Sequence, residues 1–150
     1  MPPKEPSISE LEAARRDLLR ATLSGSCSEA WPRVRQHLIE SPSILPEEEI
    51  PTVWEGPNRG WLLPLPFESL RDFVRKYRQD ATEKLVEALK DPEPLVVGYA
   101  LHALSQIEAS RFGKLSAAVE HREEGIHTIF GSFGWEGSLA EYAIRLREEP

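Results

Sequence analysis

Three residues that can bind a metal stand at regular spacing towards the end of the chain. His121, Glu124 and His127 are each three positions apart. If residues 121–127 form a helix, the three side chains share one side of it and could bind a divalent cation. A structural metal site usually requires a fourth ligand and firmer spacing. We therefore interpret the segment as a turn with solvated side chains, and we predict no bound metal or other cofactor.

Residue types used in nucleophilic and acid–base catalysis are also present. Cys27 precedes His37, but a cysteine nucleophile must contact its base, and a third group usually orients that base. We interpret Cys27 as a small buried apolar residue. The glutamates at 47–49 stand beside proline and are expected to be solvated, whereas catalytic carboxylate pairs need burial that separates their pKa values. We therefore assign no catalytic residues and expect the protein not to be an enzyme.

The glycine-rich segment at 131–137, GSFGWEG, is a further candidate. It follows no predicted strand and lacks the lysine of a phosphate-binding loop. We interpret it as a turn between helices. Phe133 and Trp135 are then expected to pack on the last helix or, alternatively, to form a contact surface.

The preferred binding site lies in the proline- and tryptophan-rich segment at 41–66. Trp54, Asn58, Arg59 and Trp61 stand close together there, and tryptophan and arginine are enriched among residues that dominate binding energy. The alternative is that both tryptophans only fasten the loop to the core. His102, off the apolar face of its predicted helix and expected to be exposed, is a further partner-binding candidate.

Charge and composition narrow the classes of partner. The 150 residues include 18 Lys and Arg against 25 Asp and Glu, which gives a formal net charge of −7. This balance argues against nucleic acid and anionic membranes as partners. The densest basic stretch, Arg71, Arg75, Lys76 and Arg78, is interpreted as a solvated helix face. One cysteine and no long apolar run or apolar leader favour a soluble, cytoplasmic protein.

The apolar spacing predicts one α-helical domain over residues 1–150. Helices are expected within residues 1–40 and again over 67–150, joined by an ordered irregular segment at 41–66. Capping patterns mark two starts, at Ser7 and at Ser138, each with a glutamate three residues later. A second helix is expected to begin at Ser28. Within the irregular segment, Val53–Trp54 and Trp61–Leu63 could form a short strand pair.

The sequence KLVEALKDPEPLVVGYALHALSQI, residues 84–107, resembles a HEAT repeat of the short, roughly 30-residue kind. The matching positions are Asp91, Pro92, Val96, Ala100, Ala103, Leu104 and Ile107. Val97 departs from the arginine usual in that family. A fainter second copy is aligned over residues 114–126. The resemblance implies an all-α fold, in which HEAT-like antiparallel helical hairpins pack as a compact solenoid-like domain.

Three functions remain open at this level. The resemblance implies a non-catalytic scaffold that binds another protein or a peptide, which is our first hypothesis. The alternative is an acidic immunity or inhibitor protein that neutralises a basic toxin or nuclease by electrostatic steering. A DNA-processing enzyme, as some HEAT-like proteins are, would need a basic concave face that a net charge of −7 argues against. The identity of the partner and the oligomeric state are left open.

Overall fold

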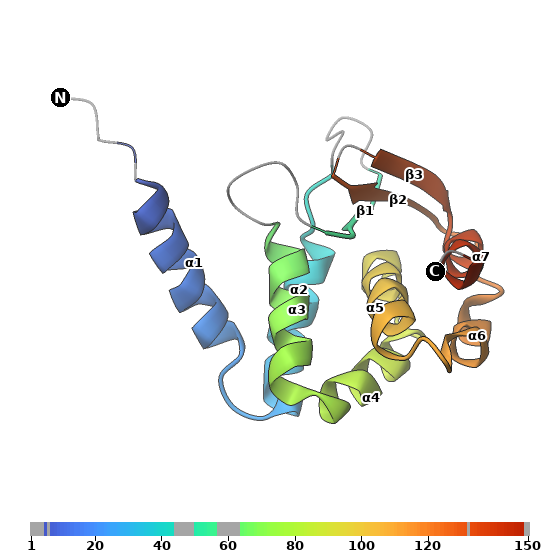
Figure 1. Cartoon of the computed structure of the whole chain (residues 1–150), viewed down its shortest axis with the longest axis horizontal. Coiled ribbons are helices and arrows are strands. Elements are labelled where there is room, and N and C mark those ends of the chain that lie inside the picture. Colours follow the sequence, from blue (N-terminus) through green and yellow to red (C-terminus); the bar gives the residue numbers. More distant parts are fainter. Residues whose placement is uncertain (1–4, 6, 44–49, 57–63, 132, 149–150) are drawn as a thin grey trace.

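A computed structural model describes residues 5, 7–43, 50–56, 64–131 and 133–148. Its elements are, in chain order, α1 (Ile8–Thr22), α2 (Cys27–Ile39), β1 (Thr52–Trp54), α3 (Leu65–Tyr77), α4 (Gln79–Ala88), α5 (Pro94–Ile107), α6 (Phe112–Leu115), a 3-10 turn η2 (Ser116–Val119), β2 (Gly125–Phe130), β3 (Phe133–Ser138) and α7 (Leu139–Glu148). The helix α2 packs beside α3. The helices α4 and α5 form a hairpin, and the three strands lie in the upper right part of the view (Figure 1). No described helix is both long and apolar enough to cross a bilayer.

Side-chain caps fix three helix starts. The Ser7 hydroxyl accepts a hydrogen bond from the Glu10 amide at 3.2 Å, and Ser138 and Glu141 cap each other reciprocally, so both predicted starts are confirmed. The second helix begins at Cys27 instead of Ser28, because Ser26 forms the capping box with Glu29. The predicted start at Ser28 lies one residue after the observed one.

Asp91 organises the turn of the α4–α5 hairpin. Its carboxylate accepts two hydrogen bonds from Arg35 on α2, at 2.7 and 2.8 Å, and one from the Glu93 amide at 2.9 Å. The Arg122 guanidinium donates to its backbone carbonyl at 2.8 Å. Burial raises the pKa of Asp91, but these hydrogen bonds and charges outweigh it and hold the pKa below its usual value. The predicted helix–turn–helix is thus tied to α2 and to the segment after η2.

A three-stranded mixed sheet corrects the all-α prediction. The strand β1 pairs in parallel with β2, which aligns Val53 with Thr128, and β2 pairs antiparallel with β3. The predicted turn at 131–137 is instead the loop and second strand of a β-hairpin, with Gly131 at φ +59° after Phe130. A glycine at positive φ suits the tight turns that connect such strands. The proposed partner strand at 61–63 lies outside the described residues.

The sheet also contradicts the second copy aligned over 114–126. That segment contains the end of α6, the turn η2 and the start of β2, where the alignment required a helical hairpin. The HEAT-like solenoid is therefore not the architecture of this region. His121 lies in a turn and His127 in β2, so the helical premise of the metal site is wrong as well. The described residues contain no cluster of three or more potential metal ligands.

Gly98 on α5 explains how the sheet joins the helical core. A Cβ atom at this position would lie 2.7 Å from Cγ2 of Val53 and 3.6 Å from Cδ1 of Ile126. Because Gly98 has no side chain, β1 and β2 approach α5 within van der Waals contact. Val53 and Ile126 are fully buried, and they belong to an apolar cluster that extends from Leu23 to Ala143. The sheet is therefore part of the main core.

Candidate functional site

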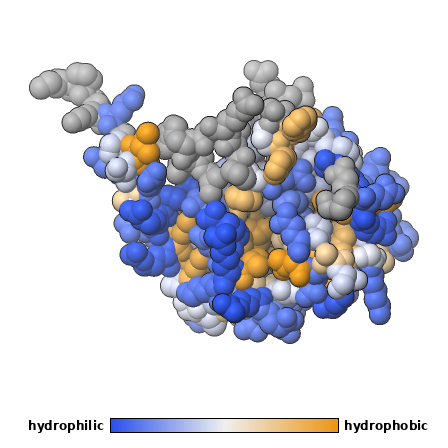
Figure 2. Space-filling view, viewed as in Figure 1, coloured by the Kyte–Doolittle hydropathy of each residue, from blue (hydrophilic) through white to orange (hydrophobic). Residues whose placement is uncertain are grey.

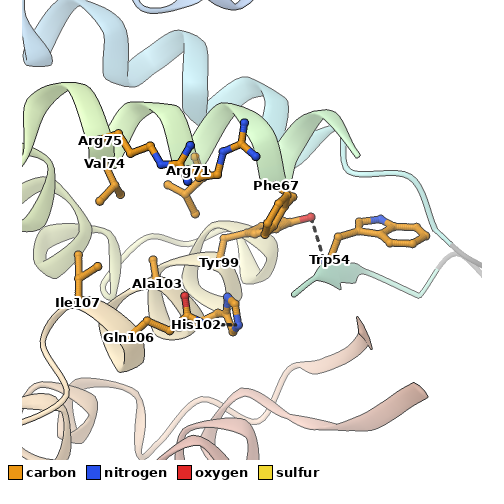
Figure 3. Close-up of a pocket in the computed structure, with 11 residues that line it drawn as sticks. Trp54, Phe67, Arg71, Val74, Arg75, Tyr99, His102, Ala103, Gln106 and Ile107 are labelled. Atoms are coloured by element: carbon orange, nitrogen blue, oxygen red, sulfur yellow. Dashed lines mark hydrogen bonds between the residues drawn. The ribbon is translucent and has the colours of Figure 1, made fainter. Parts of the chain in front are cut away.

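A pocket of about 370 Å³ lies between α3, α5 and the end of β1 (Figure 3). Among the described residues its lining is mostly apolar, and polar groups come from two arginines, a tyrosine, a histidine, a glutamine and the indole N–H of a tryptophan. The lining residues are Trp54, Phe67, Leu70, Arg71, Val74, Arg75, Tyr99, His102, Ala103, Gln106 and Ile107. An apolar cavity of this size with a few polar groups is the usual form of a ligand or side-chain binding site.

The surface around the pocket also has an apolar area beside a polar one. Hydrophobic residues gather between α3 and α5, beside a column of hydrophilic residues over α3 (Figure 2). Ile107, at one end of the lining, is 40% exposed. The described part of this face therefore presents apolar surface to solvent next to polar side chains.

Trp54 is held at the pocket by hydrogen bonds at both its backbone and its ring. Its indole Nε1 donates to the Pro42 carbonyl at 3.0 Å, and its backbone amide donates to Tyr99 Oη at 3.1 Å. Ser41 Oγ lies 2.7 Å from the same Tyr99 oxygen and donates to the Thr52 carbonyl at 2.8 Å. Ser41 has one hydroxyl proton, and it is donated to the Thr52 carbonyl. The Tyr99 hydroxyl must therefore be the donor in its hydrogen bond with Ser41.

These bonds form a directional chain that links α5 to β1. The chain runs from the Trp54 amide through Tyr99 and Ser41 to the Thr52 carbonyl. Each of the two hydroxyl groups accepts one hydrogen bond and donates the next. Burial raises the pKa of Tyr99, which keeps its hydroxyl protonated. Trp54 is only 8% exposed, so it both fastens the segment to the core and lines the pocket.

His102 connects the pocket to a buried charged group behind it. Its Nε2 lies 4.0 Å from Glu55 Oε2, and Tyr142 donates to the same carboxylate oxygen at 2.8 Å. Arg145 Nη1 is 3.7 Å from the other oxygen of Glu55. Burial lowers the pKa of His102, Glu55 raises it and Arg145 lowers it further, with a net downward shift. His102 is therefore neutral at pH 7.

A row of alternating charges runs along α3, and two of its members, Arg71 and Arg75, line the pocket. Arg15 on α1 pairs with Glu68 at 2.9 Å, and Arg71 lies 3.7 Å from Glu68 and 3.0 Å from Asp72. Asp72 in turn lies 4.0 Å from Arg75, whose side chain is 70% exposed. We call these five residues the charge row. It has a cation at each end, and three cations face two carboxylates.

Two of the predicted partner-binding residues meet at this pocket. Trp54 and His102, 48 positions apart in the sequence, both line it. His102 was expected to be exposed, but its side chain is only 14% exposed, because it packs towards Glu55. Asn58, Arg59 and Trp61 lie outside the described residues.

The sequence reasoning missed most of the pocket lining. Phe67, Leu70 and Val74 line the pocket but were not among the predicted binding residues. Arg71 and Arg75 were assigned to a solvated face. The sequence did contain a signal for this part of the lining, because Arg71 and Arg75 lie one turn apart on the same predicted helix as Phe67, Leu70 and Val74.

The sequence pair Cys27 and His37 does not form a nucleophile–base pair among the described contacts. Cys27 is buried, and burial, followed by the charge of Asp80, raises the pKa of its thiol. His37 Nδ1 instead lies 2.9 Å from Ser69 Oγ. Ser69 is fully buried and is not among the residues that line the pocket described above.

Comparison with known proteins gives no relative for this chain. No protein-family model, curated protein or solved structure matches it. The proposals that follow therefore depend on the residues and geometry described above.

Proposed function

We propose that the protein is a non-catalytic interaction module whose contact site is the pocket between α3 and α5. The supporting observation is the joint presence of Trp54 and His102, predicted as binding residues, in the lining of one apolar pocket. A partner protein would insert an apolar side chain there. Residues that dominate binding energy typically fill such desolvated pockets and are surrounded by groups that exclude water.

The chemistry of the lining favours binding over catalysis. The His102 Nε2 atom lies near Glu55 and Gln106, at 4.0 and 3.4 Å, and no nucleophile contacts it among the described residues. The two arginines belong to the charge row, whose ion pairs hold their guanidinium groups along the rim. Such a site offers shape, apolar area and fixed charge, which are the requirements of recognition.

Filling the pocket tests this function. Ala103 lines it and is partly exposed, so Ala103→Trp should occupy the space with little disturbance of the core. Ala118, exposed outside this pocket, provides the matched control Ala118→Trp. Each protein would be immobilised and used for affinity capture from cells of its source, with identification by mass spectrometry. We expect one partner to bind the wild type and Ala118→Trp and to be lost from Ala103→Trp.

Circular dichroism would establish that each variant is folded. If Ala103→Trp fails to fold, Ile107→Ser removes apolar area at a position that is already 40% exposed. Undiminished binding of the same partner to either folded variant would contradict the proposed site.

The inhibitor hypothesis would explain one particular result. A basic partner whose binding resists pocket filling but weakens steeply with salt would favour neutralisation of a toxin, because the chain carries a net charge of −7.

A further inference from the structure

The charge row places positive charge at the edge of the pocket. Two of its cations, Arg71 and Arg75, line the pocket, whereas their partners Glu68 and Asp72 are not among the lining residues. The cation at one end, Arg15, has a side chain only 16% exposed and pairs with Glu68 at 2.9 Å. The cation at the other end, Arg75, is 70% exposed and lies 4.0 Å from Asp72. A guanidinium is therefore presented to solvent at Arg75, on the rim of the pocket.

The rest of the lining does not cancel this charge. None of the eleven lining residues is an aspartate or a glutamate. His102 adds no charge at neutral pH, and Glu55 lies on the far side of it with Tyr142 and Arg145 as neighbours. An occupant of the pocket therefore meets apolar groups on its walls and a guanidinium at its edge.

The acidic character of the whole chain does not override the local charge. Interactions between exposed charges are screened beyond about 8 Å at physiological ionic strength. The net charge of −7 is spread over the molecule, whereas Arg71 and Arg75 would be in direct contact with an occupant. Contact distance therefore decides the sign of the preference.

We propose, on the basis of the function proposed above, that the pocket recognises a peptide segment in which an aromatic side chain stands next to an aspartate or glutamate. The aromatic ring enters between α3 and α5, where Phe67, Val74 and Ile107 provide the walls. The neighbouring carboxylate accepts hydrogen bonds from the exposed guanidinium of Arg75, whose planar donors match a carboxylate. The partner is thus an acidic, aromatic segment of another protein.

Three blocked pentapeptides test this chemistry directly. Each has a central phenylalanine between two identical residues, which are glutamate, glutamine or lysine, with glycine at both ends. Titration would be followed by the amide resonances of the 15N-labelled protein. We expect the glutamate peptide to perturb Arg75, Ala103 and Gln106 and to bind about two- to fivefold more tightly than the glutamine peptide, the effect of one exposed ion pair. The lysine peptide should bind most weakly.

Matched variants separate local charge from net charge. Arg75→Gln should abolish the preference for glutamate over glutamine. Lys90→Gln removes the same charge from an exposed position outside the pocket and should leave the preference intact. Equal binding of all three peptides to the wild type, or an unchanged preference in Arg75→Gln, would overturn the acidic specificity.

The outcomes distinguish this inference from the function on which it rests. If the three peptides bind equally and Ala103→Trp blocks them all, the pocket is a binding site without acidic specificity. If no peptide perturbs the pocket and Ala103→Trp also retains the captured partner, both proposals fail.

Discussion

The contact between the sheet and α5 at Gly98 makes a quantitative prediction about stability. In a helix interior without tertiary contact, Gly→Ala stabilises by about 1 kcal/mol. At Gly98 the new Cβ would lie 2.7 Å from Val53 Cγ2, and Val53 is a fully buried, β-branched residue that cannot easily move away. Such overpacking costs about 1–3 kcal/mol. We therefore expect Gly98→Ala to destabilise the protein by about 1 kcal/mol.

A double-mutant cycle isolates this contact. Val53→Ala removes the two methyl groups and should by itself cost about 2 kcal/mol, the order expected for deleting buried methyl groups. In the Val53→Ala protein, the new Cβ of Gly98→Ala no longer clashes. The higher helix propensity of alanine should then stabilise the protein by about 1 kcal/mol. The expected coupling energy is therefore about 2 kcal/mol, within the range found for residues in contact.

Urea unfolding of the four proteins, followed by circular dichroism and tryptophan fluorescence, measures the cycle. Gly113→Ala in α6 is a control, because its Cβ would meet only Arg147 Cδ at 4.0 Å. If Gly98→Ala stabilises equally in both backgrounds, the two residues are not in contact and the packing of the sheet on α5 is incorrect.

Three further perturbations test other contacts. Asp91→Asn breaks the charge-assisted pair with Arg35 and should lower the free energy of unfolding, measured in urea, by about 2 kcal/mol. Arg35→Lys cannot donate the same two bonds but keeps the charge, so it should cost less. Tyr99→Phe leaves the buried Trp54 amide without its acceptor and should cost about 1–3 kcal/mol in the same assay; an unchanged value would contradict the hydrogen-bond chain. Because the folded pKa of His102 is lowered, the unfolded chain takes up a proton first, so stability should fall as pH drops below about 6.5. His102→Gln should remove part of this fall in thermal melts between pH 7 and 5, and an identical pH profile would show that His102 does not contribute.

The helices were predictable because their signals are local. Each of these helix boundaries is marked by residues that lie within a few positions of one another. Examples are the caps at Ser7 and Ser138 and the turn at Asp91–Pro92. The parallel pairing of β1 with β2 has no such local signal, since Val53 and Thr128 are roughly 75 residues apart and β1 is only three residues long.

The β2–β3 hairpin was predictable in principle. Gly-Ser between two apolar runs is a hairpin signal, and Ile126, Thr128 and Ile129 are β-branched. The alignment of a second helical copy took precedence over this signal and gave the wrong result.

The candidate site shows the same division between local and distant information. Trp54 and His102 were identified by residue type and by position on a predicted helix, but their meeting at one pocket depends on the Tyr99 hydrogen-bond chain. The two bonds that Tyr99 makes in that chain join residues 58 and 45 positions apart, so sequence spacing could not indicate them.

The parallel β1–β2 pair has a consequence for how the chain folds. In a helical repeat array each unit contacts only its neighbours, so folding can begin anywhere and spread. Here β1 must wait for a partner synthesised roughly 75 residues later, and closing so long a loop carries an entropy cost before any contact repays it. We expect the helical segments to form early and the sheet to complete folding in a slower step, with β1 and β2 stabilised together.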